Sequence, residues 1–203
     1  MNSFQFTKMD TFHLCRKLES VGIQYIEIGH GLGLGAYRMG GSYSAAASDQ
    51  DYMEAARDGL SRAKFGMFCI PGIANLDDID IASDHGMHFL RVGIDVSEVE
   101  KTSAFIERAK KNGMLVATNY MKSYVVAPRE FAEKARMSKE YGTDIVYLVD
   151  SAGGMLPKEV ESYIDVLNDL VEIDFGYHGH DNLGLAVANS LVCYEKGARF
   201  IDT

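Results

Sequence analysis

The segment Gly176-Tyr177-His178-Gly179-His180-Asp181-Asn182-Leu183-Gly184 joins an apolar run, 170–175, to a helical pattern over 185–196. It therefore predicts the end of a buried strand, a loop and the start of a helix. Because side chains alternate in direction along a strand, His178 and His180 are expected to point to the same side. Two imidazoles with carboxylate and amide oxygens beside them can hold a divalent cation. The pair is thus a candidate metal site, and the alternative is a solvated pair of loop histidines.

The same strand–loop–helix pattern recurs along the whole chain. Short apolar runs rich in Val, Ile and Phe predict seven buried strands, with helical periodicity between them. The runs are 25–28, 65–70, 89–92, 114–118, 145–149, 173–177 and 199–201. Strands that alternate with helices indicate a parallel sheet with right-handed crossovers.

The expected helix ends carry their own signals. Segments 7–10 and 97–100 resemble capping boxes, in which a side-chain oxygen accepts from a backbone N–H of the first turn. Pro128 and Pro157 suit the first helical position, where a backbone N–H is not needed. Glycines stand between helix and strand, where a left-handed residue is wanted. These glycines are Gly22, Gly86, Gly113, Gly142 and Gly197.

Two α/β architectures fit this order, a (β/α)₈ barrel and a doubly wound open sheet. Polar residues follow several of the expected strands, which is typical of a barrel, whereas an open sheet gathers its ligand at one switch point. They are His30, Asp95, Asn119, Asp150 with Ser151, and His178 with His180. We therefore predict one domain over residues 1–203, an incomplete (β/α)₈ barrel of about seven strands.

Composition excludes some classes of partner. The chain carries 20 Lys and Arg against 29 Asp and Glu, a net charge of −9. This acidity argues against a nucleic-acid or membrane partner. Cys15, Cys69 and Cys193 are dispersed and odd in number, which predicts unpaired thiols in a reducing compartment. The first eight residues lack the pattern of a signal peptide, so the expected location is the cytoplasm.

Four motifs follow one another along the chain: 26–35 around His30, Ile70-Pro71-Gly72-Ile73, 149–155 around Asp150-Ser151, and 178–190 with its two histidines. In this order the chain resembles the 4-hydroxy-2-oxovalerate aldolases. They belong to the metal-dependent lyase superfamily that also holds HMG-CoA lyase and isopropylmalate synthase. The resemblance runs along the whole chain, and the His-x-His-x-Asn-Leu and Asp-Ser-x-Gly motifs are its more specific parts.

The resemblance implies a divalent metal, Mn²⁺ or Mg²⁺, held by His178 and His180, and a small 2-oxo acid substrate whose carboxylate binds Ser151. Asp181 and Asn182 would orient an imidazole, although Asn182 equally suits a helix cap. Ser151 equally suits a turn or helix cap, and His30 is a further candidate for substrate binding. A homo-oligomer and an acylating aldehyde dehydrogenase partner are implied by the same analogy.

The family's Leu-Arg-Asp-Gly motif has no match here. By resemblance that motif supplies the third metal ligand and an arginine, a histidine shortly after it is the base, and a tyrosine comes from a C-terminal region. The catalytic residues are therefore left unassigned. We expect a fragment, a mis-started reading frame or a domain completed by another segment, and we expect the chain alone to be inactive.

The expected reaction is cleavage of a 4-hydroxy-2-oxo acid to pyruvate and an aldehyde through a metal-bound enolate. One alternative is a Claisen-type transferase that joins an acyl-CoA to a 2-oxo acid, as in isopropylmalate synthase. Another is a degenerate barrel without catalytic activity, used for binding or assembly.

Overall fold

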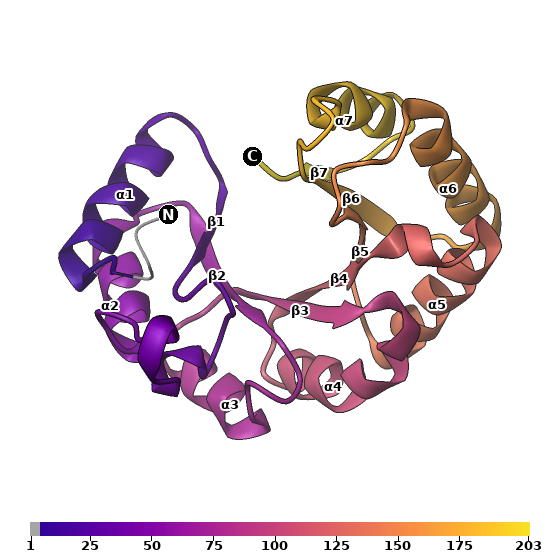
Figure 1. The fold of residues 1–203 in the computed structure, drawn as a ribbon. Coiled ribbons are helices and arrows are strands. Elements are labelled where there is room, and N and C mark those ends of the chain that lie inside the picture. The colour runs from indigo at the N-terminus through magenta and orange to yellow at the C-terminus, as the bar shows by residue number, and fades with distance from the viewer. Residues whose placement is uncertain (1–4) are drawn as a thin grey trace. The chain divides into compact units, whose positions relative to one another are not determined.

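The computed structural model describes residues 5–203, so the first four residues of the segment inspected for a signal peptide lie outside it. Helices and strands alternate along the chain (Figure 1). The strands are β1 (Tyr25–Ile28), β2 (Lys64–Cys69), β3 (Phe89–Asp95), β4 (Leu115–Met121), β5 (Ile145–Asp150), β6 (Asp174–Gly179) and β7 (Phe200–Ile201). The seven predicted strands are confirmed, each within a few residues of its expected bounds.

The α-helices are α1 (Lys8–Ser20), α2 (Asp49–Gly59), α3 (Leu76–Asp84), α4 (Ser103–Lys111), α5 (Pro128–Tyr141), α6 (Pro157–Leu170) and α7 (Ala186–Glu195). Four short 3₁₀ helices occur in the loops of the part of the chain that the structure describes. They are η1 (Ala36–Arg38), η2 (Gly41–Tyr43), η3 (Val96–Thr102) and η4 (Ser123–Val125).

The strand order follows the chain from β1 to β7, and the recorded pairings are parallel. A doubly wound sheet reverses its order at a switch point, and no reversal occurs among the described strands. The order is that of a (β/α)₈ barrel with seven of its eight strands, which confirms the predicted α/β class.

Residue contacts divide the chain into two compact units. The first comprises Met1–Val92 and Glu107–Leu115, and the second comprises Gly93–Ile106 and Val116–Thr203. In the first unit α1 and α2 lie beside β1 and β2 (Figure 1). The side chains of Ile26, Phe65 and Met67 are buried there.

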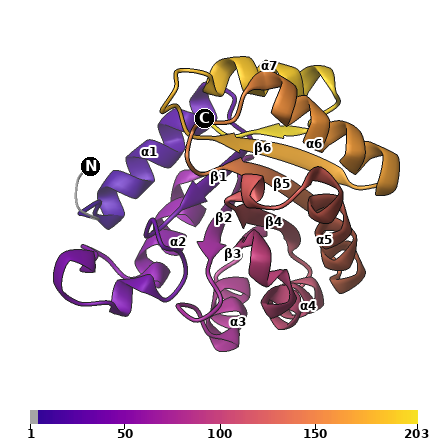
Figure 2. The ribbon, with the colours of Figure 1, turned by 45° about the vertical axis from the view of Figure 1, so that its right-hand side comes forward.

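The second unit has a hydrophobic core of its own. All six residues of β5 are buried, as expected for a central parallel strand. Helices α5, α6 and α7 lie along one side of β5 and β6 (Figure 2). Between them the Phe131 ring meets Tyr120 and Tyr163 edge-on, with ring centroids 5.7 Å apart in both pairs. Burial of each such ring contributes about 1.5–3 kcal/mol.

Most predicted helix ends are confirmed. Thr7 and Asp10 form a capping box at the start of α1, and Pro128 and Pro157 occupy the first turns of α5 and α6. The five predicted glycines all have positive φ, between 77° and 109°. The box predicted at 97–100 is wrong: Asp95 caps η3 instead, because its carboxylate accepts from the Ser97 N–H.

The predicted unpaired state of the cysteines is confirmed, since Cys15, Cys69 and Cys193 are all buried and free. No helix within residues 5–203 combines the length and the apolar character that a bilayer crossing requires.

Candidate functional site

Strand register in the second unit places three polar residues together. In the β6–β7 pairing Tyr177 stands opposite Ile201, so Asp202 comes beside His178. Tyr177 belongs to the buried core, on the side packed by the helices. Because directions alternate along a strand, His178 faces the opposite side of the sheet. The ring therefore lies at the carboxyl end of β6, where parallel α/β folds place their chemistry.

The two histidines lie next to each other. Their ring centroids are 5.2 Å apart, at an interplanar angle of 64°. The predicted common direction of the two side chains is thus confirmed. Nδ1 of His178 lies 2.7 Å from Oδ2 of Asp202. That contact uses one ring nitrogen of His178 and leaves Nε2 as its possible metal donor.

The ring nitrogens of His178 and His180 could supply part of the coordination shell of a metal ion. Two adjacent imidazoles are proper ligands for a divalent transition-metal ion. Within residues 5–203 no group of three His, Cys, Asp or Glu side chains is arranged to hold a metal. The described residues therefore fit a cation as two of its ligands, and the remaining ligands would be water, substrate or groups outside this set.

Asp150 organises the loop that follows β5. Its side chain is buried, and its two carboxylate oxygens accept from the N–H groups of Gly154 (3.1 Å) and Met155 (2.9 Å). The Met155 carbonyl in turn accepts from the amide of the buried Asn189 on α7 (2.9 Å). The Asp150 carbonyl accepts from the His180 N–H (3.1 Å). Asp150 thus ties the loop after β5 to the histidine segment.

Ser151 follows Asp150 at the start of the same loop, and its hydroxyl oxygen accepts a hydrogen bond. Its Oγ accepts from the backbone N–H of Lys122 at 2.9 Å. A hydroxyl that accepts in this way keeps its own hydrogen available to donate. This hydrogen bond therefore leaves the Ser151 hydroxyl able to donate.

Lys122 was not predicted as a site residue. It is the one non-glycine residue with positive φ (57°) among those described, a conformation that concentrates at functional sites. Its ammonium lies 2.8 Å from Oδ2 of Asp95 at the end of β3. That contact, with the N–H of Ser97, lowers the pKa of Asp95 to about 2. Asn119 lies inside β4 and is buried, which corrects its predicted place in a loop.

The residues predicted to orient an imidazole have other contacts. Oδ1 of Asp181 accepts from the Ala186 N–H (2.9 Å) at the start of α7. The backbone of Asn182 lies against Gly153. The carboxylate that does contact a histidine is Asp202. It is polar and directly follows the last apolar run, so the rule that singled out Asp95 and Asp150 could have found it.

His30 lies in the first unit and is buried within its own loop. Its Nε2 lies 3.0 Å from the Tyr43 carbonyl, and its Nδ1 accepts from the Leu32 N–H at 3.0 Å. The role in substrate binding stays a prediction, because a substrate oxygen would have to replace one of these two partners.

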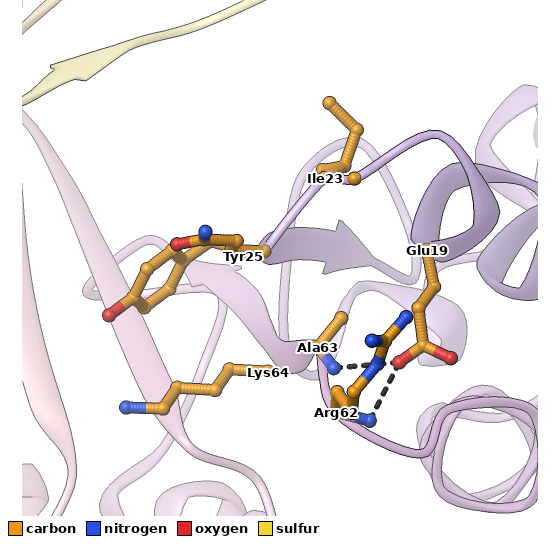
Figure 3. A pocket seen from close by; sticks show the side chains of 8 residues that line it. Glu19, Ile23, Tyr25, Arg62, Ala63 and Lys64 are labelled. Carbon is orange, nitrogen blue, oxygen red and sulfur yellow. Dashed lines mark hydrogen bonds between the residues drawn. The ribbon is translucent and has the colours of Figure 1, made fainter.

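A cavity of about 460 Å³ in the first unit is a poor alternative site. It lies at the amino ends of β1 and β2 and is lined by Glu19, Tyr25, Arg62 and Lys64, among others. The Glu19 carboxylate accepts from the backbone N–H groups of Arg62 and Ala63 (Figure 3). These bonds lower the pKa of Glu19 to about 2 and commit it to holding the turn before β2.

The chain is similar in sequence to a known protein family and to proteins of named activity. The model of the HMGL-like family matches residues 2–203. The chain is 38% identical over 200 residues to 4-hydroxy-2-oxovalerate aldolase 2 of Rhodococcus jostii (strain RHA1), covering 98% of this chain and 58% of that protein. It is 36% identical to the oxaloacetate decarboxylase of Mycobacterium tuberculosis (strain ATCC 25618 / H37Rv), with 98% and 59% covered. The chain thus spans somewhat more than half the length of these relatives.

Solved structures share the fold. The carboxyl transferase domain of Rhizobium etli pyruvate carboxylase with oxamate and biotin superposes with a TM-score of 0.84 at 15% identity, over 98% of this chain and 36% of that one. An N-terminal domain from Bacteroides vulgatus superposes with a TM-score of 0.79 at 22% identity, over 100% of this chain and 67% of that one. At such identities the likeness concerns the fold alone.

Proposed function

Because the chain belongs to the HMGL-like family, we propose that the protein it forms cleaves 4-hydroxy-2-oxo acids to pyruvate and an aldehyde with the help of a divalent metal. The observation that carries the proposal is the adjacent His178–His180 pair, with Asp202 on Nδ1 of His178. Relatives named 4-hydroxy-2-oxovalerate aldolase align along 98% of the chain and support the choice of reaction.

The residues of this chain bind and orient in that reaction. His178 and His180 would hold the cation, which when bound would supply Lewis-acid chemistry to the reaction. Ser151 donates its hydroxyl hydrogen to the substrate carboxylate. A base outside the assigned residues takes the proton of the 4-hydroxyl group. The C3–C4 bond then breaks to give the aldehyde and the enolate of pyruvate, which is protonated at C3.

A second candidate reaction is the decarboxylation of oxaloacetate, favoured by the relative from Mycobacterium tuberculosis. Loss of CO₂ from C4 also leaves the enolate of pyruvate, so the same two histidines and Ser151 would serve. The two reactions differ in the group that departs, an aldehyde in one and CO₂ in the other.

The test uses the full-length polypeptide that contains this sequence, with pyruvate release coupled to lactate dehydrogenase. We expect turnover of 4-hydroxy-2-oxo acids that EDTA abolishes and that Mn²⁺ or Mg²⁺ restores. His178→Ala and His180→Ala should each remove turnover, because each deletes a metal ligand. Ser151→Ala should act mainly on KM, since its hydrogen bond serves ground state and transition state alike.

Three results would count against the aldolase. Undiminished turnover in EDTA excludes a role for the metal. Turnover that requires an acyl-CoA assigns the Claisen-type reaction instead. CO₂ release from oxaloacetate without aldehyde release from any 4-hydroxy-2-oxo acid assigns the decarboxylase.

The remaining expectations belong to the same proposal. Residues 1–203 form part of one barrel domain, the metal is Mn²⁺ or Mg²⁺, and the protein works as a homo-oligomer in the cytoplasm. An acylating aldehyde dehydrogenase would be a suitable partner, because it would consume the reactive aldehyde. The three unpaired thiols support a reducing compartment.

A further inference from the structure

We propose that Asp202 is a positioning residue that fixes the Nδ1–H tautomer of His178 and so directs Nε2 of that ring towards the cation. The inference rests on the proposed function only for the presence of the cation.

Backbone pairing between β6 and the end of β7 positions the Asp202 carboxylate beside His178. The Asp202 N–H donates to the Tyr177 carbonyl (3.1 Å), which continues the β6–β7 ladder by one residue. Residues side by side in adjacent parallel strands project to the same face of the sheet. Asp202 and His178 therefore share the face opposite the helix-packed core, and their 2.7 Å contact follows from the register of the two strands.

The chemistry of the contact selects the tautomer. An ionised carboxylate only accepts hydrogen bonds, so the Nδ1 atom beside it must carry the hydrogen. In the neutral ring Nε2 then has the lone pair, as a metal ligand requires. Histidine ligands commonly donate their other N–H to a carboxylate, which orients the ring and raises its basicity. The alternative is a plain ion pair in which His178 is protonated at both nitrogens and cannot bind a metal.

The first measurement needs no metal. In the full-length protein labelled with ¹⁵N-histidine, two-dimensional NMR at neutral pH reports which ring nitrogen of His178 carries the hydrogen. We expect the Nδ1–H form, and we expect Asp202→Ala to shift the ring towards Nε2–H. A wild-type ring that is protonated on Nε2 alone, or on both nitrogens, overturns the proposal.

The second measurement follows Mn²⁺ binding by electron paramagnetic resonance. Asp202→Ala should weaken Mn²⁺ binding 10–100-fold. Asp202→Asn should recover part of this loss, because its amide oxygen can still accept from Nδ1–H. The control is Asp165→Ala, which removes an exposed carboxylate of α6 that bonds Lys196. Equal Mn²⁺ affinity in Asp202→Ala and wild type, with folding unchanged, also overturns the proposal.

Neither readout uses pyruvate release, so the two proposals can fail separately. If the Mn²⁺ affinity depends on Asp202 but the protein releases no pyruvate, the proposed reaction is refuted and the role of Asp202 stands. If the protein is an aldolase but neither the His178 tautomer nor the Mn²⁺ affinity changes in Asp202→Ala, the proposed reaction stands and the role of Asp202 is refuted.

Discussion

Asp49 is a carboxylate buried without full hydrogen bonding. At the first position of α2 its side chain is 4% exposed, Oδ2 accepts from the Gly35 N–H (2.7 Å), and Oδ1 has no partner among the described residues. Burial, with a smaller contribution from nearby Asp78, raises its pKa to about 6, although the Gly35 N–H and Arg38 oppose the shift. The Arg38 guanidinium is itself committed to Asp78 through two bonds of 2.8 Å.

The raised pKa of Asp49 predicts that the free energy of unfolding decreases as pH rises. Because the folded state binds this proton more tightly than the unfolded state, the contribution is complete below pH 4 and is lost as pH rises to about 6. The loss is about 2–3 kcal/mol. Asp49→Asn should remove this slope from the free energy of unfolding, measured by urea denaturation between pH 4 and 8. The control is the exposed carboxylate in Asp84→Asn, and an unchanged slope in Asp49→Asn would refute the assignment.

At the residue scale the sequence identified groups whose chemistry is local. The two histidines and Ser151 stand in motifs, and alternation along the strand was enough to predict that the two histidine rings share a direction. Asp202 and Lys122 were missed because their partners are distant along the chain. Asp202 lies 24 residues from His178, and Lys122 lies 29 from Ser151. Such contacts depend on strand register, which a single sequence does not specify.

At the element scale, the loops after β5 and β6 are locked together. The Leu183 N–H donates to the Gly153 carbonyl (3.0 Å), and the His180 N–H donates to Asp150. Gly153 has φ of +62°, and a Cβ there would lie 2.5 Å from the Asn182 nitrogen and 2.6 Å from the His180 oxygen. Only glycine permits this approach. The position of His180 therefore depends on a residue that carries no chemistry of its own.

Neighbouring Gly154 offers a matched control for this dependence, because its φ is not positive and a Cβ there meets nothing within 4 Å. We expect Gly153→Ala to destabilise the full-length protein by about 1–3 kcal/mol and to weaken Mn²⁺ binding. Gly154→Ala should change stability by no more than about 0.5 kcal/mol. Thermal unfolding and Mn²⁺ titration provide the two measurements. Equal effects of the two substitutions would show that loop contact does not position His180.

Elements themselves were the most predictable level. Strands and helix ends depend on nearest neighbours, such as apolar runs, Pro128 and Pro157 in first turns, and glycines at left-handed positions. The failure at Ser97 has a local cause. Asp95 stands two residues earlier and is the stronger competitor for the N–H groups of the turn.

At the scale of the whole molecule, an apolar face lies open on α7. Val187, Leu191 and Tyr194 are spaced to share one side of the helix, and each is more than half exposed. The neighbouring β7 is last in the strand order and has one recorded pairing, with β6. The periodicity of residues 185–196 predicted a helix, and the structure shows that these apolar positions of the helix are exposed in this chain. An apolar face beside an edge strand is a common cause of self-association.

We therefore expect the 203-residue chain, produced by itself, to associate or aggregate and to release no pyruvate. Light scattering coupled to size-exclusion chromatography measures the association. Val187→Glu with Leu191→Glu should shift the chain towards monomer, because two charges on the α7 face oppose its burial in an assembly. Lys158→Glu changes an exposed residue of α6 and lowers the net charge by the same two units, so it should leave the assembly as it is. A monodisperse wild-type monomer with one cooperative thermal transition would mean that neither the α7 face nor the β7 edge needs a partner.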